Sequence, residues 1–450
     1  MDNEDVITLP AAFDLGVSTS AFQTEAASGR GESIWDRFLA GTGMSEDDRL
    51  VAADHLSHVE QDLDLVAALG VSAYRFSLSW PRVQPEGKGR PRREALDRYD
   101  RLVDQALARG LDPWPCLYHW DLPQPLQERG GWRDRDTAYR LADYAEVVAD
   151  VLGGRARRVF VLNEPNVQAV LGHLSGVHAP GIADLETFLA AVHHLNLAHG
   201  LAVARLREAT PNTEVGTILS LQPIGAAAEG EEHEAAAGLA DAAYRKAFLD
   251  PLLGRGYPEA LAGMLERHVQ RGDLELISQP IDVLGVNYYT RLRVLADPSG
   301  PAGMALAEPP KEAPVTAMGW EVVPDGLTDV LTSLRDEYGD PPVVITECGA
   351  AFDDVASKSG RVDDLGRARF IVAHLRAALA ARDAGCDVRG FLVWTLVDNL
   401  EWTFGFDKRF GLVRLERPSL RRVPKLSYDV LASIARSGEV PPPEAVGDLT

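Results

Sequence analysis

The sequence predicts a single (β/α)8 barrel, the TIM-barrel form of the α/β class, over residues 1–450. Short apolar runs rich in β-branched residues alternate with longer segments in which apolar residues recur every three or four positions. Eight such strand-then-helix units follow one another, which is typical of a closed parallel barrel. No linker, charge block or low-complexity tract interrupts them, and barrels of this length commonly form one domain.

The eight predicted strands are short and apolar. They are Leu15–Ser18, Ala73–Ser77, Pro113–Tyr118, Val159–Leu162, Val215–Leu219, Val283–Asn287, Val343–Thr346 and Phe391–Thr395. The intervening segments have helical periodicity. These helices are predicted at Leu56–Leu69, Arg93–Ala108, Ala138–Val151, Leu185–Arg207, Ala235–Phe248, Leu327–Tyr338 and Asp364–Ala384. Glycines such as Gly70, Gly110 and Gly385 end several of them.

An open, doubly wound sheet is the alternative fold, and it usually carries a glycine-rich turn after its first strand. Here the first strand leads into residues 19–25, Thr-Ser-Ala-Phe-Gln-Thr-Glu, which form no phosphate cradle. The sequence contains neither GxGxxG nor GxxxxGK[ST]. We therefore favour the barrel and expect no cofactor.

Charge and composition restrict the possible partners. The formal net charge is −22 and the pI is about 4.9, so the surface repels phosphate backbones and anionic membranes. We expect no nucleic-acid partner and no membrane partner. The residues at the start of the sequence are acidic rather than basic and apolar, and no apolar run approaches the roughly 18 residues of a membrane span. These features predict a cytoplasmic protein whose oligomeric state is left open.

Neither the cysteines nor the histidines predict a metal site. The three cysteines are far apart in the sequence, which argues against disulfides and zinc. His193, His194 and His199 share one predicted helix, but their spacing does not give an i,i+4 metal pair, so we interpret them as packing residues. Residues 231–234, Glu-Glu-His-Glu, are predicted to be a solvated acidic turn.

One long segment, residues 296–319, lies between the sixth and seventh predicted strands. It is rich in Pro, Gly and Ala and lacks periodicity. Loops of this length in compact domains are usually functional lids or mobile segments. We predict a substrate-side lid, with a merely mobile insertion as the alternative.

Polar and aromatic residues follow the strands at the end where barrel enzymes build their active sites. They are Gln23, Arg75, His119, Trp120, Asn163, Glu164, Asn287, Tyr289, Glu347, Trp394, Glu401 and Trp402. Amides and carboxylates can form bidentate hydrogen bonds with the hydroxyl groups of a sugar, and indole rings can stack on its C–H faces. Two carboxylates at two strand ends, Glu164 and Glu347, are the apparatus of glycoside hydrolysis. A single such glutamate is more often a solvated or ion-paired carboxylate, so the argument rests on the coincidence of many residues.

At these residues the sequence resembles glycoside hydrolase family 1, the β-glucosidase family, from Phe13 to about Tyr428. The motifs that carry the resemblance are specific and occur in order. They are residues 19–25, residues 74–82 (Tyr-Arg-Phe-Ser-Leu-Ser-Trp-Pro-Arg), residues 118–123 (Tyr-His-Trp-Asp-Leu-Pro), residues 162–165 (Leu-Asn-Glu-Pro), residues 286–290 (Val-Asn-Tyr-Tyr-Thr), residues 345–347 (Ile-Thr-Glu), residues 399–402 (Asn-Leu-Glu-Trp) and residues 408–412 (Lys-Arg-Phe-Gly-Leu).

The resemblance implies a role for each residue. Glu164 would be the general acid/base and Glu347 the nucleophile, with Arg75 and Tyr289 orienting the nucleophile. The residues that would bind the small-molecule β-glycoside are Gln23, His119, Trp120, Asn163, Asn287, Tyr289, Trp320, Trp394, Glu401, Trp402 and Phe410. Of these, Trp394 would form the stacking floor under the sugar and Trp320 a platform for the leaving group.

The expected reaction is hydrolysis of β-D-glucosides with retention, through a covalent glycosyl-enzyme intermediate, with β-galactosides and β-fucosides as further substrates. Retention requires the two carboxyl groups to lie about 5–5.5 Å apart, and a gap near 9 Å would contradict it. Glu401 would repel a 6-phosphate, which favours a free sugar. Two alternatives stay open: a transglycosylase in which an alcohol replaces water, and a non-catalytic sugar-binding protein. Leaving-group specificity is also left open.

The sequence departs from the family pattern at five positions. Cys348 follows the nucleophile, where the family usually has Asn, and Ala26 replaces a usual Gly. Val159, Val161 and Leu15 stand where Trp or Thr is common. We interpret Cys348 as a neutral replacement by a small apolar residue, in preference to a change of activity.

Overall fold

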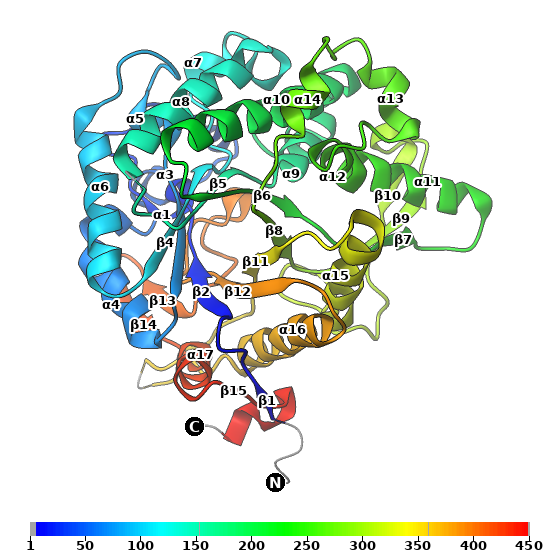
Figure 1. Ribbon diagram of the computed structural model, residues 1–450. Helices are drawn as coiled ribbons and strands as arrows, with labels where there is room; N and C mark the ends of the chain where they lie inside the picture. The colour runs from blue at the N-terminus through cyan, green and yellow to red at the C-terminus, as the bar shows by residue number, and fades with distance from the viewer. Residues whose placement is uncertain (1–5, 153, 359, 449–450) are drawn as a thin grey trace.

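The computed structural model arranges the eight predicted strands in a closed parallel barrel surrounded by helices (Figure 1). It describes residues 6–152, 154–358 and 360–448. The barrel strands are β2 (Asp14–Ser18), β3 (Ala73–Ser77), β4 (Asp112–Tyr118), β5 (Arg158–Asn163), β6 (Glu214–Ser220), β8 (Val283–Tyr288), β11 (Val343–Cys348) and β12 (Val388–Trp394). They follow chain order around the barrel, and β12 pairs with β2 to close it. The predicted (β/α)8 fold is confirmed.

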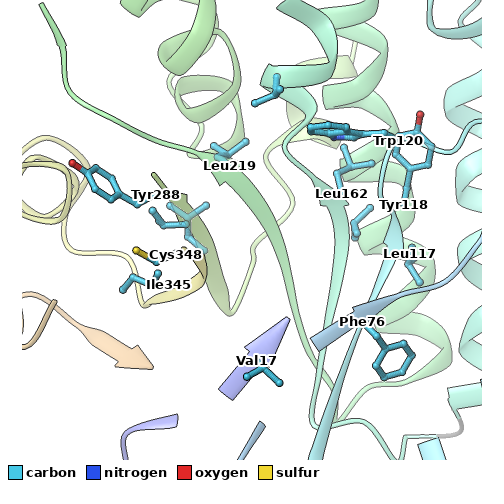
Figure 2. Close-up of a cluster of buried hydrophobic side chains, with 14 of the residues drawn as sticks. Val17, Phe76, Leu117, Tyr118, Trp120, Leu162, Leu219, Tyr288, Ile345 and Cys348 are labelled. Atoms are coloured by element: carbon cyan, nitrogen blue, oxygen red, sulfur yellow. The ribbon is translucent and has the colours of Figure 1, made fainter. Parts of the chain in front are cut away.

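The barrel strands have two apolar faces, as buried parallel strands do. Side chains from seven of the strands fill the interior. They are Ala73, Trp114, Cys116, Phe160, Ile218, Val283, Val344 and Leu392. The outward side chains join a larger core beneath the helices, to which Val17, Phe76, Leu117 and Ile345 belong (Figure 2). The barrel is therefore packed at its centre and leaves the carboxyl ends of its strands free to carry polar groups.

Long amphipathic helices cover the outer face. They are α4 (Val59–Leu69), α6 (Arg93–Ala108), α8 (Asp136–Leu152), α10 (Leu185–Ala209), α15 (Pro324–Tyr338) and α16 (Leu365–Asp383). Helix α6 shows why such segments fold this way, because Ala95, Tyr99, Leu102 and Ala106 form one buried stripe at helical spacing. The remaining predicted helix is divided into α11 (Glu231–Asp241), the π-helical segment η5 (Ala242–Lys246) and α12 (Ala247–Leu252). The predicted acidic turn at 231–234 is the first turn of α11, where carboxylates suit the helix dipole.

Further short elements lie in the connections. The helices are α1 (Ala21–Thr24), α2 (Ile34–Ala40), α3 (Glu46–Val51), α5 (Trp80–Val83), α7 (Gln124–Gln127), α9 (Pro165–Ala169), α13 (Glu259–Leu265) and α14 (Asp273–Ile277), and the longer α17 (Leu426–Ser437) packs on α4 and α16. The π-helical segment η4 is Val170–Leu174, and the 3-10 helices are η2 (His55–Ser57), η3 (Gly131–Arg133), η6 (Pro301–Gly303), η7 (Trp402–Phe404) and η8 (Pro443–Asp448). Within the described ranges, none of the helices combines the length and apolarity needed to span a membrane.

Three small sheets lie outside the barrel. Strands β1 (Ile7–Thr8) and β15 (Glu439–Val440) join the two ends of the chain, and β13 (Val413–Glu416) pairs with β14 (Arg421–Pro424) (Figure 1). The third sheet has the order β10-β9-β7 and consists of β7 (Ile224–Ala226), β9 (Leu292–Ala296) and β10 (Met304–Leu306). Part of the segment predicted to be aperiodic, 296–319, is thus a strand, because β10 pairs antiparallel with β9.

Candidate active site

The predicted site residues gather at the carboxyl ends of the barrel strands, where most of them line one cavity of about 490 Å³. The predicted residues in its lining are Gln23, His119, Trp120, Glu164, Tyr289, Trp320, Glu347, Trp394, Glu401, Trp402 and Phe410. Arg75, Asn163 and Asn287 are fully buried behind this lining. Strands β2 to β5, β8, β11 and β12 each contribute a residue, directly or in the connection that follows.

A β-bulge precedes each of the two glutamates. On β5, the chain advances three residues from Phe160 to Asn163 while the paired strand β6 advances only two. Glu164 directly follows Asn163. On β11, the two steps from Ile345 to Glu347 match only one on β8. A bulge breaks the strict in-and-out alternation of side chains and often occurs beside active sites. The same local irregularity therefore brings both carboxylates into the cavity.

Glu347 is held by a cation and a phenol. Arg75 Nη1 donates to Glu347 Oε1 in a buried ion pair, and the Tyr289 hydroxyl donates to Oε2 at 2.6 Å. Burial, followed by the negative charge of Glu347, raises the pKa of Tyr289 well above its usual range, so this hydroxyl remains a donor. Both partners donate hydrogen bonds to the carboxyl group of Glu347 and fix its orientation.

Glu164 has a different environment. Its side chain is buried, and its Oε1 accepts a hydrogen bond from Asn287 Nδ2 at 3.0 Å. Burial, followed by the charge of Glu347, raises the pKa of Glu164 to about 8, so the carboxyl group is protonated at neutral pH. Its backbone is left-handed, with φ 46° and ψ 55°, which is costly for a residue with a Cβ and is characteristic of functional sites.

The two glutamates are linked by buried amides. Asn163 Oδ1 accepts from Arg75 Nη2 at 2.7 Å and from Asn287 Nδ2 at 3.1 Å. Thr346 Oγ1 donates to Asn287 Oδ1 at 2.7 Å, which orients the amide that reaches Glu164. The environments of the two glutamates therefore depend on one hydrogen-bond network, and a change in either amide affects both.

The remaining lining combines polar groups with aromatic rings. Gln23 Nε2 donates to Glu401 Oε2 at 3.3 Å, and burial, followed by the charge of Glu347, raises the pKa of Glu401 to about 8. The rings of Trp120 and Trp402 stack with centroids 4.7 Å apart, and both residues have positive φ. Burial, followed by the charge of Arg75, lowers the pKa of His119 well below its usual range, which makes its imidazole neutral. Such a surface offers hydrogen bonds at its edges and flat faces for stacking.

Comparisons with known proteins agree with this geometry. The family model described as "Glycosyl hydrolase family 1" matches residues 6–440. The chain belongs to glycosyl hydrolase family 1. It is 39% identical over 430 residues to the β-glucosidase A of Thermotoga maritima, covering 94% of this chain and 96% of that protein. It is 40% identical to a bifunctional β-D-glucosidase/β-D-fucosidase of Bifidobacterium breve, covering 93% and 96%. Among solved structures, the Thermotoga maritima β-glucosidase in complex with glucoimidazole has a TM-score of 0.90 and 38% identity, covering 96% and 99%.

Several residues of this family 1 site were missed by the sequence analysis. Ser220, Gln222 and Tyr244 line the cavity, and Gln222 Nε2 donates to the Tyr244 hydroxyl at 2.9 Å. Ser220 ends β6, the only predicted strand for which no end residue was considered, so the rule applied to the other strands would have found it. Tyr244 lies in the π-helical segment η5 and carried no signal in the sequence.

The departures from the family 1 pattern lie away from the cavity. Cys348 is fully buried and packs in the outer core with Ile345 and Tyr288 (Figure 2). Burial raises the pKa of its thiol well above the usual range, so it remains a neutral thiol. Val159 and Val161 belong to the same core. Within the described residues, no group of three or more His, Cys, Asp and Glu side chains is placed to hold a metal ion.

Proposed function

We propose that the protein is a retaining exo-β-glycosidase that hydrolyses β-D-glucosides. The observation that carries the proposal is one cavity with two glutamates in opposite electrostatic surroundings. Glu347 is ion-paired with Arg75, whereas Glu164 is protonated at neutral pH. Family 1 membership and relatives named as β-glucosidases support the choice of sugar, and the bifunctional relative supports β-fucosides as further substrates.

In the first step, a carboxylate oxygen of Glu347 attacks the anomeric carbon and forms an ester bond to the sugar. The bond from that carbon to the leaving oxygen breaks, and Glu164 transfers its proton to this oxygen, so the leaving group departs as a neutral alcohol. Arg75 and Tyr289 hold the attacking carboxylate in place. Because Glu164 is protonated up to about pH 8, the acid is ready at neutral pH.

In the second step, water attacks the anomeric carbon from the side that the leaving group has vacated. Glu164, now a carboxylate, accepts a proton from this water, and the ester bond to Glu347 breaks. Esterification removes the charge of Glu347 that raises the pKa of Glu164, so the loss of a proton by Glu164 is favoured at this stage. Two displacements at one carbon restore the original β configuration.

The remaining site residues bind and orient the sugar. We assign hydrogen bonds with its hydroxyl groups to Gln23, His119, Glu401 and Trp402, which line the cavity. Trp394 is the stacking floor, with Trp120 and Phe410 completing the aromatic wall, and Trp320 lies toward the leaving group. Asn163 and Asn287, also predicted to bind substrate, form hydrogen bonds with protein groups, and we assign them the positioning of both glutamates.

We also propose that residues 296–319 act as a lid on the substrate side. Met304, Leu306 and Met318 from this segment line the cavity. A hydrogen bond anchors the C-terminal end of the segment: Lys408 Nζ donates to the Ala317 carbonyl oxygen at 2.5 Å. A segment that lines the cavity and is anchored at both ends can close over a bound sugar without leaving the site.

Azide rescue tests both assignments. In Glu347→Gly, azide can enter the space of the missing carboxylate, and we expect it to restore release of the leaving group from dinitrophenyl β-glucoside and to give α-glucosyl azide. In Glu164→Gly, azide enters from the opposite side of the sugar, and we expect β-glucosyl azide. Reversed stereochemistry would exchange the two roles. Release of α-glucose as the first product of the unmodified enzyme, followed by NMR, would overturn retention.

A further inference from the structure

The part of the cavity beyond the glutamates is lined by apolar side chains from two excursions of the chain. Helix α9 and the π-helical segment η4 contribute Val167, Val170, Leu171 and Leu174. The sheet β10-β9-β7, which lies at the periphery beside α11 (Figure 1), contributes a second set. This set consists of Ile224, Leu292, Val294, Met304 and Leu306. Both sets lie in the connections that follow β5, β6 and β8.

Several polar side chains in this region already have protein partners. Gln222 Nε2 donates to the Tyr244 hydroxyl at 2.9 Å, and Ser175 Oγ donates to a carbonyl oxygen of η4 at 3.2 Å. Arg291 and Glu321 form a two-contact ion pair. These groups are therefore partly occupied before any ligand enters.

The apolar surface continues to the mouth of the cavity. Leu306 is 67% exposed and Phe404 is 46% exposed, and both line the cavity. Large apolar side chains exposed together at the rim of a pocket are typical of a binding surface. Arg293 adds one cationic group to this lining and His178 one imidazole, which is fewer polar groups than the several hydroxyls of a second sugar require.

We propose that the outer cavity selects β-glucosides with an apolar alkyl or aryl leaving group over those whose leaving group is another sugar. This inference rests on the proposed function and specifies its substrate class. An apolar chain removes Leu171, Leu292 and Leu306 from water and is itself removed from water. A sugar in the same place loses hydrogen bonds to water and gains few in return, which is costly.

A series of unactivated alkyl glucosides provides the test. Methyl, butyl and hexyl β-glucosides have leaving alcohols of similar basicity, so differences in kcat/KM among them report binding of the chain. We expect kcat/KM to rise roughly two- to fourfold for each buried methylene, or on the order of 30-fold or more from methyl to hexyl. Hexyl glucoside should also exceed cellobiose by at least about tenfold. Calorimetric titration of hexyl and methyl 1-thio-β-glucosides should give the same order of affinity without turnover.

A double variant and its control test whether the apolar side chains of β9 and β10 cause the preference for hexyl glucoside. The double variant Leu292→Thr/Leu306→Thr places one hydroxyl group on strand β9 and one on strand β10. Threonine is a residue that β-strands accommodate well. We expect the hexyl-to-methyl ratio to fall by about tenfold. Leu185→Thr is the matched control, because Leu185 is exposed but lies outside the cavity lining, and the ratio should not change.

The outcomes separate this inference from the proposed function. A hexyl-to-methyl ratio near one, or a preference for cellobiose, would overturn the inference while hydrolysis of β-glucosides stands. An unchanged ratio in the double variant would also overturn it, since the chain would then bind elsewhere. Failure to cleave any β-glucoside, aryl substrates included, would overturn the proposed function and this inference together.

Discussion

Glu164 and Glu347 occupy equivalent places in the barrel and have opposite surroundings. Each follows a β-bulge at the carboxyl end of a buried strand, and each side chain is almost fully buried in the same cavity. Glu347 has a guanidinium group and a phenol as partners, whereas Glu164 accepts an amide hydrogen bond. We infer from this difference that the partners, more than the strand end, set the proposed roles of the two glutamates as acid and nucleophile.

The electrostatics of the pair are also asymmetric. Arg75 compensates the charge of Glu347 directly, and the charge of Glu347 in turn contributes to the high pKa of Glu164. Burial makes the largest contribution to the high pKa of Glu164, and the positive charge of Arg75 acts in the opposite direction. Variants that change one member of this set should affect the two reaction steps unequally.

Loss of the nucleophile should have the largest effect. We expect Glu347→Gln to lower kcat for aryl β-glucosides by about 10⁴-fold or more, because no ester with the sugar can form and the replacement removes the charge that raises the pKa of Glu164. Steady-state kinetics measure this, with Glu259→Gln as the control, since Glu259 is an exposed residue at the start of α13. A loss below about tenfold would exclude Glu347 as the nucleophile.

Loss of the acid should depend on both pH and leaving group. Glu164 donates its proton only while protonated, so kcat/KM of the unmodified enzyme should fall above a pKa of about 8. Glu164→Gln should lower kcat/KM by roughly 10²–10⁴-fold for alkyl glucosides, but far less for dinitrophenyl glucoside, whose leaving group needs no proton. In the variant the alkaline fall should disappear, and with dinitrophenyl glucoside it should already be weak in the unmodified enzyme.

A second buried carboxyl group, that of Glu401, titrates in the same pH range and must be distinguished from Glu164. The pKa of Glu401 is also raised to about 8, by burial and then by the charge of Glu347. If the alkaline fall persists in Glu164→Gln, then Glu401 or another group produces it, and the assignment of the acid from the pH profile is wrong. The dependence on leaving group would then be the remaining support for Glu164.

Removal of one partner of Glu347 should have a smaller effect. Tyr289→Phe deletes the hydrogen bond to Oε2 and keeps the ion pair with Arg75, so we expect kcat to fall by about 10–100-fold. Pre-steady-state kinetics separate the rates of the two steps. They should show whether attack by Glu347 on the sugar or its later release from the sugar is slowed more. Tyr139→Phe, on the exposed face of α8, is the control and should not change either rate.

The barrel and the polar residues around the two glutamates were predictable because their signals are local. An apolar, β-branched run ending in a carboxylate or amide marks a strand end wherever it occurs, as at Asn163 and Glu347. The hydrogen-bond partners of these residues could not be predicted from spacing. Arg75 and Glu347 are 272 positions apart, and only barrel closure brings them together. The resemblance to a family supplied that pairing.

The connections were harder to predict for a physical reason. Strand β10 has three residues and no periodic pattern, and it exists because β9 offers an edge to pair with. The helix predicted over 235–248 begins four residues earlier and contains a π-helical segment, which hydrophobic spacing does not reveal. The apolar outer cavity is built from these elements, so its character became visible only in three dimensions.

The smallest expected effect on turnover concerns Cys348, the residue that follows the nucleophile. Its side chain is buried in the outer core beside Tyr288 and Ile345 (Figure 2) and is not part of the cavity lining. We expect Cys348→Asn to leave kcat within about tenfold and to lower the free energy of unfolding by about 1–3 kcal/mol, because an amide replaces a thiol among apolar side chains. Denaturant unfolding and kcat, measured alongside Cys348→Ala, separate the two effects. A large loss of kcat at unchanged stability would show that this position acts on Glu347, and the difference between the two glutamates would then extend to the residue beside the nucleophile.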